Sequence, residues 1–452
     1  MVDPSHPVTI LGAGLTGLTA GYILARRGIP VRLFESESQA GGMAVTLQRG
    51  DFRFDLGPHR FYTQDQEVIA LVKELLGSEL QEHKRMSSIH LGGRKLEYPP
   101  NVANLVRSTE LTKSLGYLWG YLKANWRWGN HKDEDIDFEN WVVSRFGRPL
   151  YELYFEPYTQ KVWGLPPREL SAELARRRIS VPNLGDVLLR LMISSRDNPG
   201  PYVTRFWYPE NGIGRIAERM VEEIVTCGGE VYLEHSVEVL HLEANRITGL
   251  TIKNGDVSNY LPTDCVFSTI PLPYLIQAMD PNQEVFEQGA KDLHYRALVF
   301  VYVFLDQPQV GYDHWIYFPE KHYIFNRVSE PRTFSPGHAP SGQTSLCAEI
   351  TCDVGDEIWN LPPDQLTADV VSQLETCGLI NPGEVLGSFT HRLRFGYPIY
   401  TVGYKKRLDS LLEFTGEIEN LITCGRQGAF DYSNMSEAIA SGIKTAQLVQ
   451  TN

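Results

Sequence analysis

A glycine-rich turn near the start of the chain has the spacing that binds a phosphate group. Gly12-Ala13-Gly14-Leu15-Thr16-Gly17 has the pattern G-x-G-x-x-G, and it stands between an apolar stretch at 8–11 and a helical stretch at 18–27. The first glycine permits a tight turn, the second lets the backbone approach a pyrophosphate, and the third lets the helix lie close to the strand. The amino terminus of the helix then stabilises the anion. These residues predict a bound dinucleotide.

An acidic residue follows at a distance that suits the ribose of such a dinucleotide. Residues 30–34 predict a second strand, and Glu35 stands 23 residues after Gly12. A carboxylate in this place accepts hydrogen bonds from the ribose hydroxyls of an adenosine, which favours an unphosphorylated ribose. The spacing alone leaves both NAD and FAD open.

A second helix start with a capping signal lies near the end of the chain. Residues 420–424 predict a buried strand that runs into a turn at Gly425-Arg426, and a helix is expected from Asn434 onward. Asn434 and Glu437 have the spacing of a capping box. The free N–H groups and partial positive charge of that helix start would stabilise negative charge on a bound group.

Composition excludes several classes of protein. The chain has 452 residues, and its 42 Lys and Arg against 55 Asp and Glu give a formal net charge of −13, which disfavours a nucleic-acid partner. The longest apolar run, 297–305, is far shorter than the roughly 20 residues that cross a bilayer, and no secretory signal is evident. The six cysteines have no metal-ligand spacing, so we expect reduced thiols, no metal site and a cytoplasmic protein.

The elements that must position these motifs change in type along the chain. Residues 64–204 are expected to form a mainly helical insertion, with apolar stripes near 103–126, 138–162 and 184–193. Strands are expected at 230–233, 237–240, 247–252, 264–270, 297–305, 315–318, 323–328 and 345–351, and a helix at 363–377. We therefore expect an α/β fold with three parts: a nucleotide-binding domain from 1–63, 205–275 and 386–452, the helical insertion at 64–204, and an antiparallel substrate-domain sheet at 276–385.

These motifs together resemble the FAD-dependent superfamily of protoporphyrinogen oxidases, amine oxidases and desaturases, and within it most closely the UDP-galactopyranose mutases. Gly41-Gly42, followed by a hairpin-like stretch at 52–55, is similar to the second fingerprint of FAD-binding oxidoreductases. The loop 57–63, Gly-Pro-His-Arg-Phe-Tyr-Thr, is similar to the loop beside the flavin in the mutases. Further ordered matches are 94–101, 155–164 and the closing stretch 425–435.

The resemblance implies a Rossmann-like FAD-binding domain and FAD as the cofactor, with the last helix against the pyrimidine end of the flavin. The cofactor contacts that it implies are Gly12, Gly14, Leu15, Thr16, Gly17, Glu35, Ser36, Gly41, Gly42, Met43, Gly57, Pro58, His59, Val237, Gly425, Arg426, Asn434, Met435 and Ser436. It implies catalytic roles for His59, Arg60, Arg327 and Arg426. The implied substrate contacts are Tyr158, Trp163, Arg205, Arg327, Tyr397 and Tyr400.

Two chemistries remain open at this point. In the mutases two arginines bind the substrate diphosphate; Arg327 is similar to one, but Pro182 stands where the other is expected, in the stretch 178–182. The favoured hypothesis is therefore an oxidoreductase that moves a hydride from a small molecule to FAD, with a separate electron acceptor, and 205–214 resembles that oxidase branch. The alternative is a mutase-like isomerase that acts on a nucleotide sugar through reduced FAD, with NAD(P)H as the electron donor.

Partners are less strongly indicated by the sequence. The stretch 115–128 is aromatic and basic, and contact with a membrane surface or a lipid-like substrate is one interpretation. Packing within the helical insertion, or a contact between two copies in a homodimer, is the favoured one. A protein that keeps FAD without catalysis is a further alternative.

Overall fold

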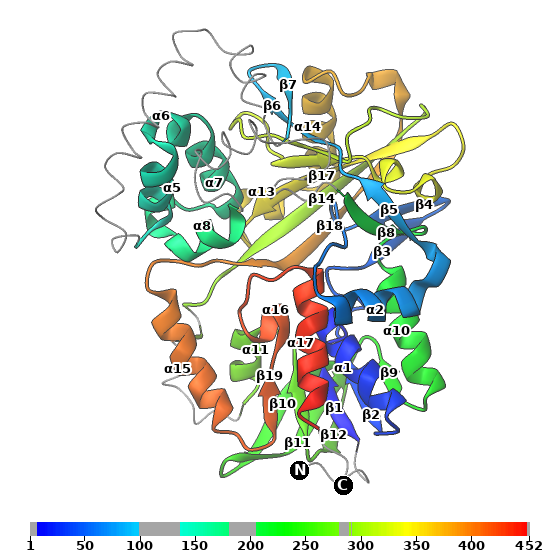
Figure 1. The fold of residues 1–452 in the computed structure, drawn as a ribbon, viewed down its shortest axis with the longest axis vertical. Helices are drawn as coiled ribbons and strands as arrows, with labels where there is room; N and C mark the ends of the chain where they lie inside the picture. Colours follow the sequence, from blue (N-terminus) through cyan, green and yellow to red (C-terminus); the bar gives the residue numbers. More distant parts are fainter. Residues whose placement is uncertain (1–6, 99–135, 180–204, 280–288, 291, 450–452) are drawn as a thin grey trace.

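Two sheets at opposite ends of the molecule organise the chain (Figure 1). The computed structural model describes residues 7–98, 136–179, 205–279, 289–290 and 292–449. A parallel sheet lies near the two termini, and a larger mixed sheet lies at the far end. The chain passes between the two sheets several times, so each half contains segments that are far apart in the sequence.

The parallel sheet has five strands in the order β19 (Leu421–Thr423), β13 (Val266–Ser268), β1 (Val8–Leu11), β2 (Val31–Phe34) and β9 (Glu230–Tyr232). Every neighbouring pair is parallel. The central strand β1 is buried on both faces, and its one polar side chain, Thr9, shares a hydrogen bond of 2.8 Å with the hydroxyl of Thr263. The predicted strands at 8–11, 30–34, 230–233 and 420–424 and the nucleotide-binding type of sheet are confirmed.

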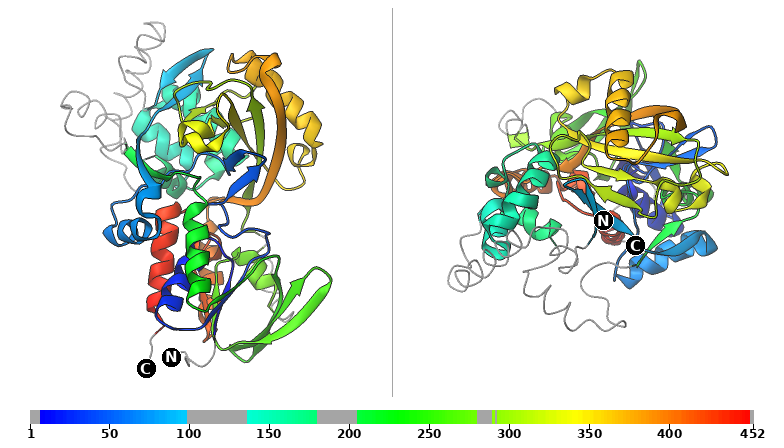
Figure 2. Two further views of the ribbon diagram at one scale, coloured as in Figure 1. Left: turned by 90° about the vertical axis from the view of Figure 1, so that its right-hand side faces the viewer. Right: turned by 90° about the horizontal axis from the view of Figure 1, so that it is seen from above.

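Helices cover one face of this sheet, and a three-stranded meander lies beyond the other. Helix α1 (Leu15–Arg26) packs against both α10 (Arg215–Thr226) and α17 (Met435–Gln447). In the left view of Figure 2, α17 (red) and α10 (green) stand next to each other, and the meander extends to the lower right, on the other side of the sheet. The meander consists of β10 (Ser236–Glu243), β11 (Arg246–Asn254) and β12 (Val257–Pro262), which confirms the predicted strands there.

The larger sheet has seven strands, and a row of polar side chains occupies one of its faces. Their order is β18 (Val385–Pro398), β14 (Tyr295–Leu305), β17 (Thr344–Cys352), β16 (Arg327–Ser329), β15 (Trp315–Tyr317), β6 (Ser87–Leu91) and β7 (Arg94–Glu97). Alternate residues of β14 face opposite sides: Val299, Val301 and Val303 pack under α14 (Pro363–Thr376), whereas Phe300 and Tyr302 face the hairpin β3 (Thr46–Arg49) and β4 (Phe52–Asp55).

A group of helices stands beside this sheet, on the side away from α14 (Figure 2). It comprises α5 (Phe138–Phe146), α6 (Arg148–Leu150), a π-helical turn at Tyr151–Phe155, α7 (Glu156–Trp163) and α8 (Ala172–Arg178). The Nζ atom of Lys161 on α7 donates to the carbonyl oxygens of Phe318 and Glu320, at 2.8 Å each. These bonds hold α7 against the loop that follows β15.

The remaining elements connect these layers. They are α2 (Gln66–Leu76), β5 (Leu80–Lys84), β8 (Arg205–Pro209), α11 (Leu272–Gln277), α13 (Glu357–Asn360), α15 (Tyr404–Gly416), α16 (Gly425–Gly428) and 3-10 turns at Gly77–Glu79, Pro167–Glu169, Pro331–Thr333, Pro336–His338 and Pro382–Glu384. Within the described ranges, no helix has both the length and the apolar character needed to cross a membrane.

Three sequence expectations about element types and boundaries need correction. The expected helical insertion at 64–204 contains the strands β5, β6 and β7, because β6 pairs in parallel with β15 and β5 pairs with β8. The boundary expected at 385/386 falls at the start of β18, which pairs with β14 and so belongs to the large sheet. The strand expected at 323–328 begins only at Arg327, since the chain turns before it. The stripes near 103–126 and 184–193 and the stretch 115–128 lie outside the described residues.

The contact between α1 and α17 depends on a glycine. A Cβ atom placed on Gly442 would lie 2.5 Å from the carbonyl oxygen of Thr16 and 2.6 Å from Cβ of Thr19. We therefore expect Gly442→Val to force the helices apart and to lower the free energy of unfolding by about 1–3 kcal/mol. Unfolding in urea, monitored by circular dichroism, measures this free energy. Lys444→Val, at an exposed position of the same helix, is the control for the helix propensity of valine. Equal stability of the two variants would contradict the prediction.

Candidate active site

The opening glycine turn and the Gly41-Gly42 doublet lie next to each other. The amide of Gly41 donates to the carbonyl oxygen of Ala13 at 2.8 Å, and Gly14 forms an isolated parallel bridge with Gly41. A Cβ atom on Gly14 would meet no atom of the protein within 4 Å, whereas one on Gly17 would collide with the carbonyl oxygen of Gly12. Gly17 thus has a packing role. The space in front of Gly14 is left open for a ligand, as a pyrophosphate requires.

Glu35 lies at the carboxyl end of β2, beside this turn. Its carboxylate accepts hydrogen bonds from the amides of Ala13 at 2.8 Å and Glu37 at 3.1 Å, and from Oγ of Ser36 at 3.3 Å. The carboxylate is therefore fixed at the edge where the adenosine ribose is expected. Val237, on β10, packs against an apolar cluster of side chains. This cluster also contains Phe34, the last residue of β2.

The start of α17 lies against the same turn, although more than 400 residues separate them. Oγ1 of Thr16 donates to the carbonyl oxygen of Ala438 at 3.0 Å, and a Cβ atom on Gly425 would lie 2.6 Å from Oγ1 of Thr16. Both halves of the capping box predicted for Asn434 and Glu437 are present. The positive ends of α1 and α17 therefore converge, which suits a group that carries negative charge at two places.

The loop after β4 connects this region to the large sheet. A Cβ atom on Gly57 would lie 2.8 Å from Oε2 of Glu349 and 3.7 Å from Nη2 of Arg327. Two residues further on, Nδ1 of His59 lies 3.3 Å from the carbonyl oxygen of Gly57. Burial lowers the pKa of His59, so its imidazole is neutral at pH 7.

Glu349, Arg327 and Tyr317 form a row across three strands of the large sheet. They are register partners on β17, β16 and β15, and side chains of partner residues point to the same face. Glu349 is 2% exposed, and its Oε2 accepts hydrogen bonds from Nε of Arg327 at 3.1 Å and from Nη2 of the same residue. Its Oε1 accepts from the hydroxyl of Tyr397 at 3.2 Å and from Nδ2 of Asn326 at 3.3 Å.

A second arginine, Arg178, faces the same row from the end of α8. Its guanidinium lies 5.3 Å from the ring centroid of Tyr432 and 5.9 Å from that of Trp163, and it donates to the Tyr432 hydroxyl. The surrounding protein opposes its charge, yet the nearby tyrosines Tyr432, Tyr158, Tyr397 and Tyr317 leave its pKa raised. We call these four tyrosines with Arg178 and Arg327 the arginine–tyrosine cluster.

The cluster bears on one step of the sequence argument. The presence of Pro182 suggested that a second arginine is missing, and Arg178, four residues earlier, places a guanidinium near the tyrosines that surround Arg327. Sequence reasoning missed Arg178 because it compared a fixed motif position, whereas the side chain reaches the cluster from the last residue of a helix. Glu349 was also missed, since a single Glu within an apolar strand carries no motif.

The remaining residues predicted to contact the substrate, together with Arg426, fall into two groups: those that pack near the arginine–tyrosine cluster and one that lies away from it. Trp163 packs on Tyr397 and Tyr432 at centroid distances of 5.8 and 5.7 Å, and Arg426 lies over the same two tyrosine rings. Tyr400 lies behind them, with its hydroxyl accepting from the amide of Tyr432 at 2.7 Å. Arg205 lies outside this group: it is exposed and pairs with Glu82 at 2.8 Å on the neighbouring strand β5.

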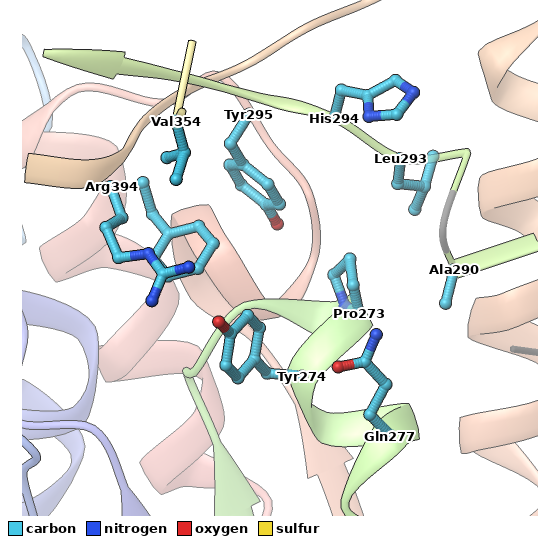
Figure 3. A pocket seen from close by; sticks show the side chains of 10 residues that line it. Pro273, Tyr274, Gln277, Ala290, Leu293, His294, Tyr295, Val354 and Arg394 are labelled. Atoms are coloured by element: carbon cyan, nitrogen blue, oxygen red, sulfur yellow. The ribbon is translucent and has the colours of Figure 1, made fainter. Parts of the chain in front are cut away.

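A separate pocket of about 220 Å³ lies near the start of β14 (Figure 3). Tyr295 separates it from α16, because the Tyr295 hydroxyl donates to the carbonyl oxygen of Gln427 on that helix at 2.9 Å. The pocket is smaller than the roughly 300–1,000 Å³ typical of ligand sites, so we assign it no role. Its lining consists of Pro273, Tyr274, Gln277, Ala290, Leu293, His294, Tyr295, Val354, Arg394 and Phe395.

Comparison with known proteins identifies the family. The family model described as flavin containing amine oxidoreductase matches residues 15–450. The chain belongs to this family. It is therefore a flavin-dependent enzyme with FAD as its cofactor, and the glycine turn, Glu35 and the start of α17 fit that cofactor in the geometry described above.

Individual relatives agree with this family. The 4,4'-diapolycopene oxygenase of a Methylomonas species is 26% identical over 420 residues, which cover 82% of this chain and 80% of that protein. The crystal structure of reduced UDP-galactopyranose mutase has a TM-score of 0.84 at 21% identity and covers 99% of this chain and 94% of that one. Putrescine oxidase bound to putrescine has a TM-score of 0.67 at 16% identity, over 98% of each chain. The predicted fold class and the predicted superfamily are confirmed.

The open space at Gly14 makes a sharp test of where the cofactor binds. We expect Gly14→Val to keep the fold, because the new side chain meets no protein atom at Cβ, but to lose FAD because it fills the place of the pyrophosphate. The ratio of flavin absorbance to protein absorbance after gel filtration measures retention, and circular dichroism reports the fold. A folded variant that keeps a full complement of FAD would contradict the placement.

Proposed function

We propose that this protein binds a nucleotide sugar and isomerises it with reduced FAD, as its structural neighbour UDP-galactopyranose mutase is named for doing. The observation that carries the proposal is that Arg178 and Arg327 both act on Tyr158, Tyr317 and Tyr397, and that Arg327 also lies beside Gly57. Guanidinium groups bind phosphate oxygens in pairs of parallel hydrogen bonds, so two of them around the same tyrosines suit a diphosphate.

The surroundings of the two arginines support binding of an anion. Glu349 fixes the guanidinium of Arg327 and, together with three tyrosines, raises the pKa of that guanidinium above its usual value, so it stays charged. Arg178 has no carboxylate within salt-bridge distance in the part of the chain that the structure describes. The Arg178 side chain is exposed, so a phosphate group from solution can reach it and pair with it.

Aromatic side chains and hydroxyls supply the rest of the proposed binding site. Tyr158, Tyr397 and Trp163 offer ring faces and hydroxyls of the kind that bind sugars, and burial raises the pKa values of Tyr158 and Tyr397, so both hydroxyls stay protonated. His59 is neutral and follows Gly57 in the loop expected beside the flavin. Reduced FAD supplies a nucleophilic nitrogen or a hydride when it is bound.

A second candidate function is hydride transfer from the substrate to oxidised FAD. The family model and the diapolycopene oxygenase relative favour it, because redox chemistry is what their names describe. In this case Arg426 and the start of α17 would stabilise the negative charge that the flavin gains. The two candidates differ in the redox state of FAD that supports turnover.

The test mixes the FAD-loaded protein with UDP-galactose under anaerobic conditions, with the flavin either oxidised or reduced by dithionite. We expect conversion to an isomer, detected by chromatography, only with the reduced flavin, and we expect the oxidised flavin spectrum to keep its intensity. Bleaching of the oxidised flavin by the sugar nucleotide would favour hydride transfer instead. A protein that binds neither FAD nor nucleotide would contradict both functions.

Replacement of Arg178 tests the role of the second arginine. A charge-assisted hydrogen bond is worth about 1.5–3 kcal/mol, so Arg178→Met should weaken binding of UDP by about tenfold to a hundredfold, as measured by titration calorimetry. Arg176→Met, an exposed arginine on the same helix, is the matched control and should bind UDP normally. Equal affinity of the two variants would remove Arg178 from the site.

A further inference from the structure

A second pair of arginines, Arg60 and Arg85, lies near Tyr317. Arg60 follows His59 in the loop expected beside the flavin, and Arg85 precedes β6. The guanidinium carbons of Arg60 and Arg85 lie 5.8 and 5.0 Å from the ring centroid of Trp315. Trp315 and Tyr317 are two residues apart on β15, so their side chains point to the same face of the sheet. The two arginines beside Trp315 therefore lie next to the arginine–tyrosine cluster, which contains Tyr317.

The pair carries positive charge that the described protein does not neutralise. Neither arginine forms a salt bridge with a described carboxylate, and Arg85 donates from Nε to Oγ of Ser87 at 3.1 Å. Burial and the charges of Arg85 and Arg327 lower the pKa of Arg60, which shows how unfavourable its surroundings are for a second cation. A bound anion would remove this penalty.

Two unused hydrogen-bond donors lie in the same group of side chains. Nη1 of Arg60 and Nε1 of Trp315 are buried, and neither has a hydrogen-bond partner among the described residues. Trp315 itself is only 3% exposed. Buried donors without partners are uncommon in folded proteins and are explained when a ligand accepts their hydrogen bonds. Both groups donate and neither accepts, so the ligand must offer acceptor oxygens.

The charge of the whole region indicates how much negative charge the ligand carries. Arg60, Arg85, Arg178 and Arg327 all act on Tyr317, and Glu349 is the only carboxylate within salt-bridge distance of any of them in the described ranges, which leaves a net charge of +3. The diphosphate of a nucleotide sugar carries about two negative charges. A substrate with one negative charge beyond those of the diphosphate would balance the net charge of +3. A carboxylate carries one negative charge and supplies this amount, whereas a phosphate monoester carries about two and would exceed it.

We propose that Arg60 and Arg85 bind a carboxylate on the sugar, so that the substrate is the nucleotide derivative of a sugar acid. This proposal rests on the proposed function, in which Arg178 and Arg327 bind the diphosphate. The carboxylate belongs to the sugar and not to the nucleotide, because Arg60 stands directly after His59 in the loop expected beside the flavin, where the reacting sugar must lie. Trp315 and Tyr98 hold the Arg85 guanidinium between them, at 5.0 and 4.9 Å from their ring centroids, and so orient it for that carboxylate.

The test compares two ligands that differ only at one carbon. Titration calorimetry of the enzyme loaded with oxidised FAD measures the affinity for UDP-galactose, which has a hydroxymethyl group, and UDP-galacturonate, which has a carboxylate there. We expect UDP-galacturonate to bind at least tenfold more tightly. In Arg60→Gln and in Arg85→Gln this preference, taken as the ratio of the two affinities measured on the same variant, should fall about tenfold. Arg219→Gln, an exposed arginine on α10 that pairs with Glu222, is the control and should keep the full preference.

The outcomes separate this proposal from the proposed function. Equal affinity of the natural protein for the two ligands, or a preference that persists in both variants, would overturn the carboxylate site and leave the nucleotide-sugar function standing. Failure to bind either ligand would overturn both. The flavin absorbance of each variant shows that it is folded and loaded, and the two single variants provide independent readings if one of them fails to fold.

Discussion

The buried carboxylate of Glu349 connects the two halves of the site. It accepts hydrogen bonds from Arg327, Asn326 and Tyr397, and it lies directly under Gly57 in the loop that follows β4. A buried carboxylate without a partner is strongly disfavoured, and breaking such an ion pair costs about 3–5 kcal/mol. The positions of Arg327 and Tyr397 are therefore fixed relative to the loop that contains Gly57.

The fold places this contact between two differently built layers. In the proposed site, the parallel sheet would present the glycine turn and the starts of α1 and α17 to the cofactor, and the large sheet would present Glu349, Arg327 and Tyr317 to the substrate. The helical group closes the site from the side, since Lys161 ties α7 to the loop after β15 and so holds Tyr158 near Tyr317. Under this proposal each layer supplies half of the site, and the contact between the two layers brings the arginine–tyrosine cluster close to the Gly57 loop.

The sequence predicted the cofactor half better than the substrate half, for physical reasons. The Gly12–Gly17 turn, Glu35 and the Asn434 cap depend on local backbone geometry, which short motifs encode and which the structure reproduces. The strands β6 and β7 lie in the segment predicted to be mainly helical, and the sequence contained no sign of them because β6 pairs with β15, more than 200 positions later. Arg178 and Glu349 depend on tertiary packing, and Arg205 lies in a suitable motif but its side chain is exposed at the start of the mostly buried strand β8.

The most direct test of the account is a crystal structure of the FAD-loaded protein with UDP bound. We predict that the pyrophosphate of FAD lies in front of Gly14, that the start of α17 lies at the pyrimidine end of the flavin, and that the diphosphate of UDP lies between Arg178 and Arg327. A nucleotide bound elsewhere, with the two guanidinium groups facing solvent while UDP is present, would contradict the central claim that this cluster is the phosphate-binding part of the active site.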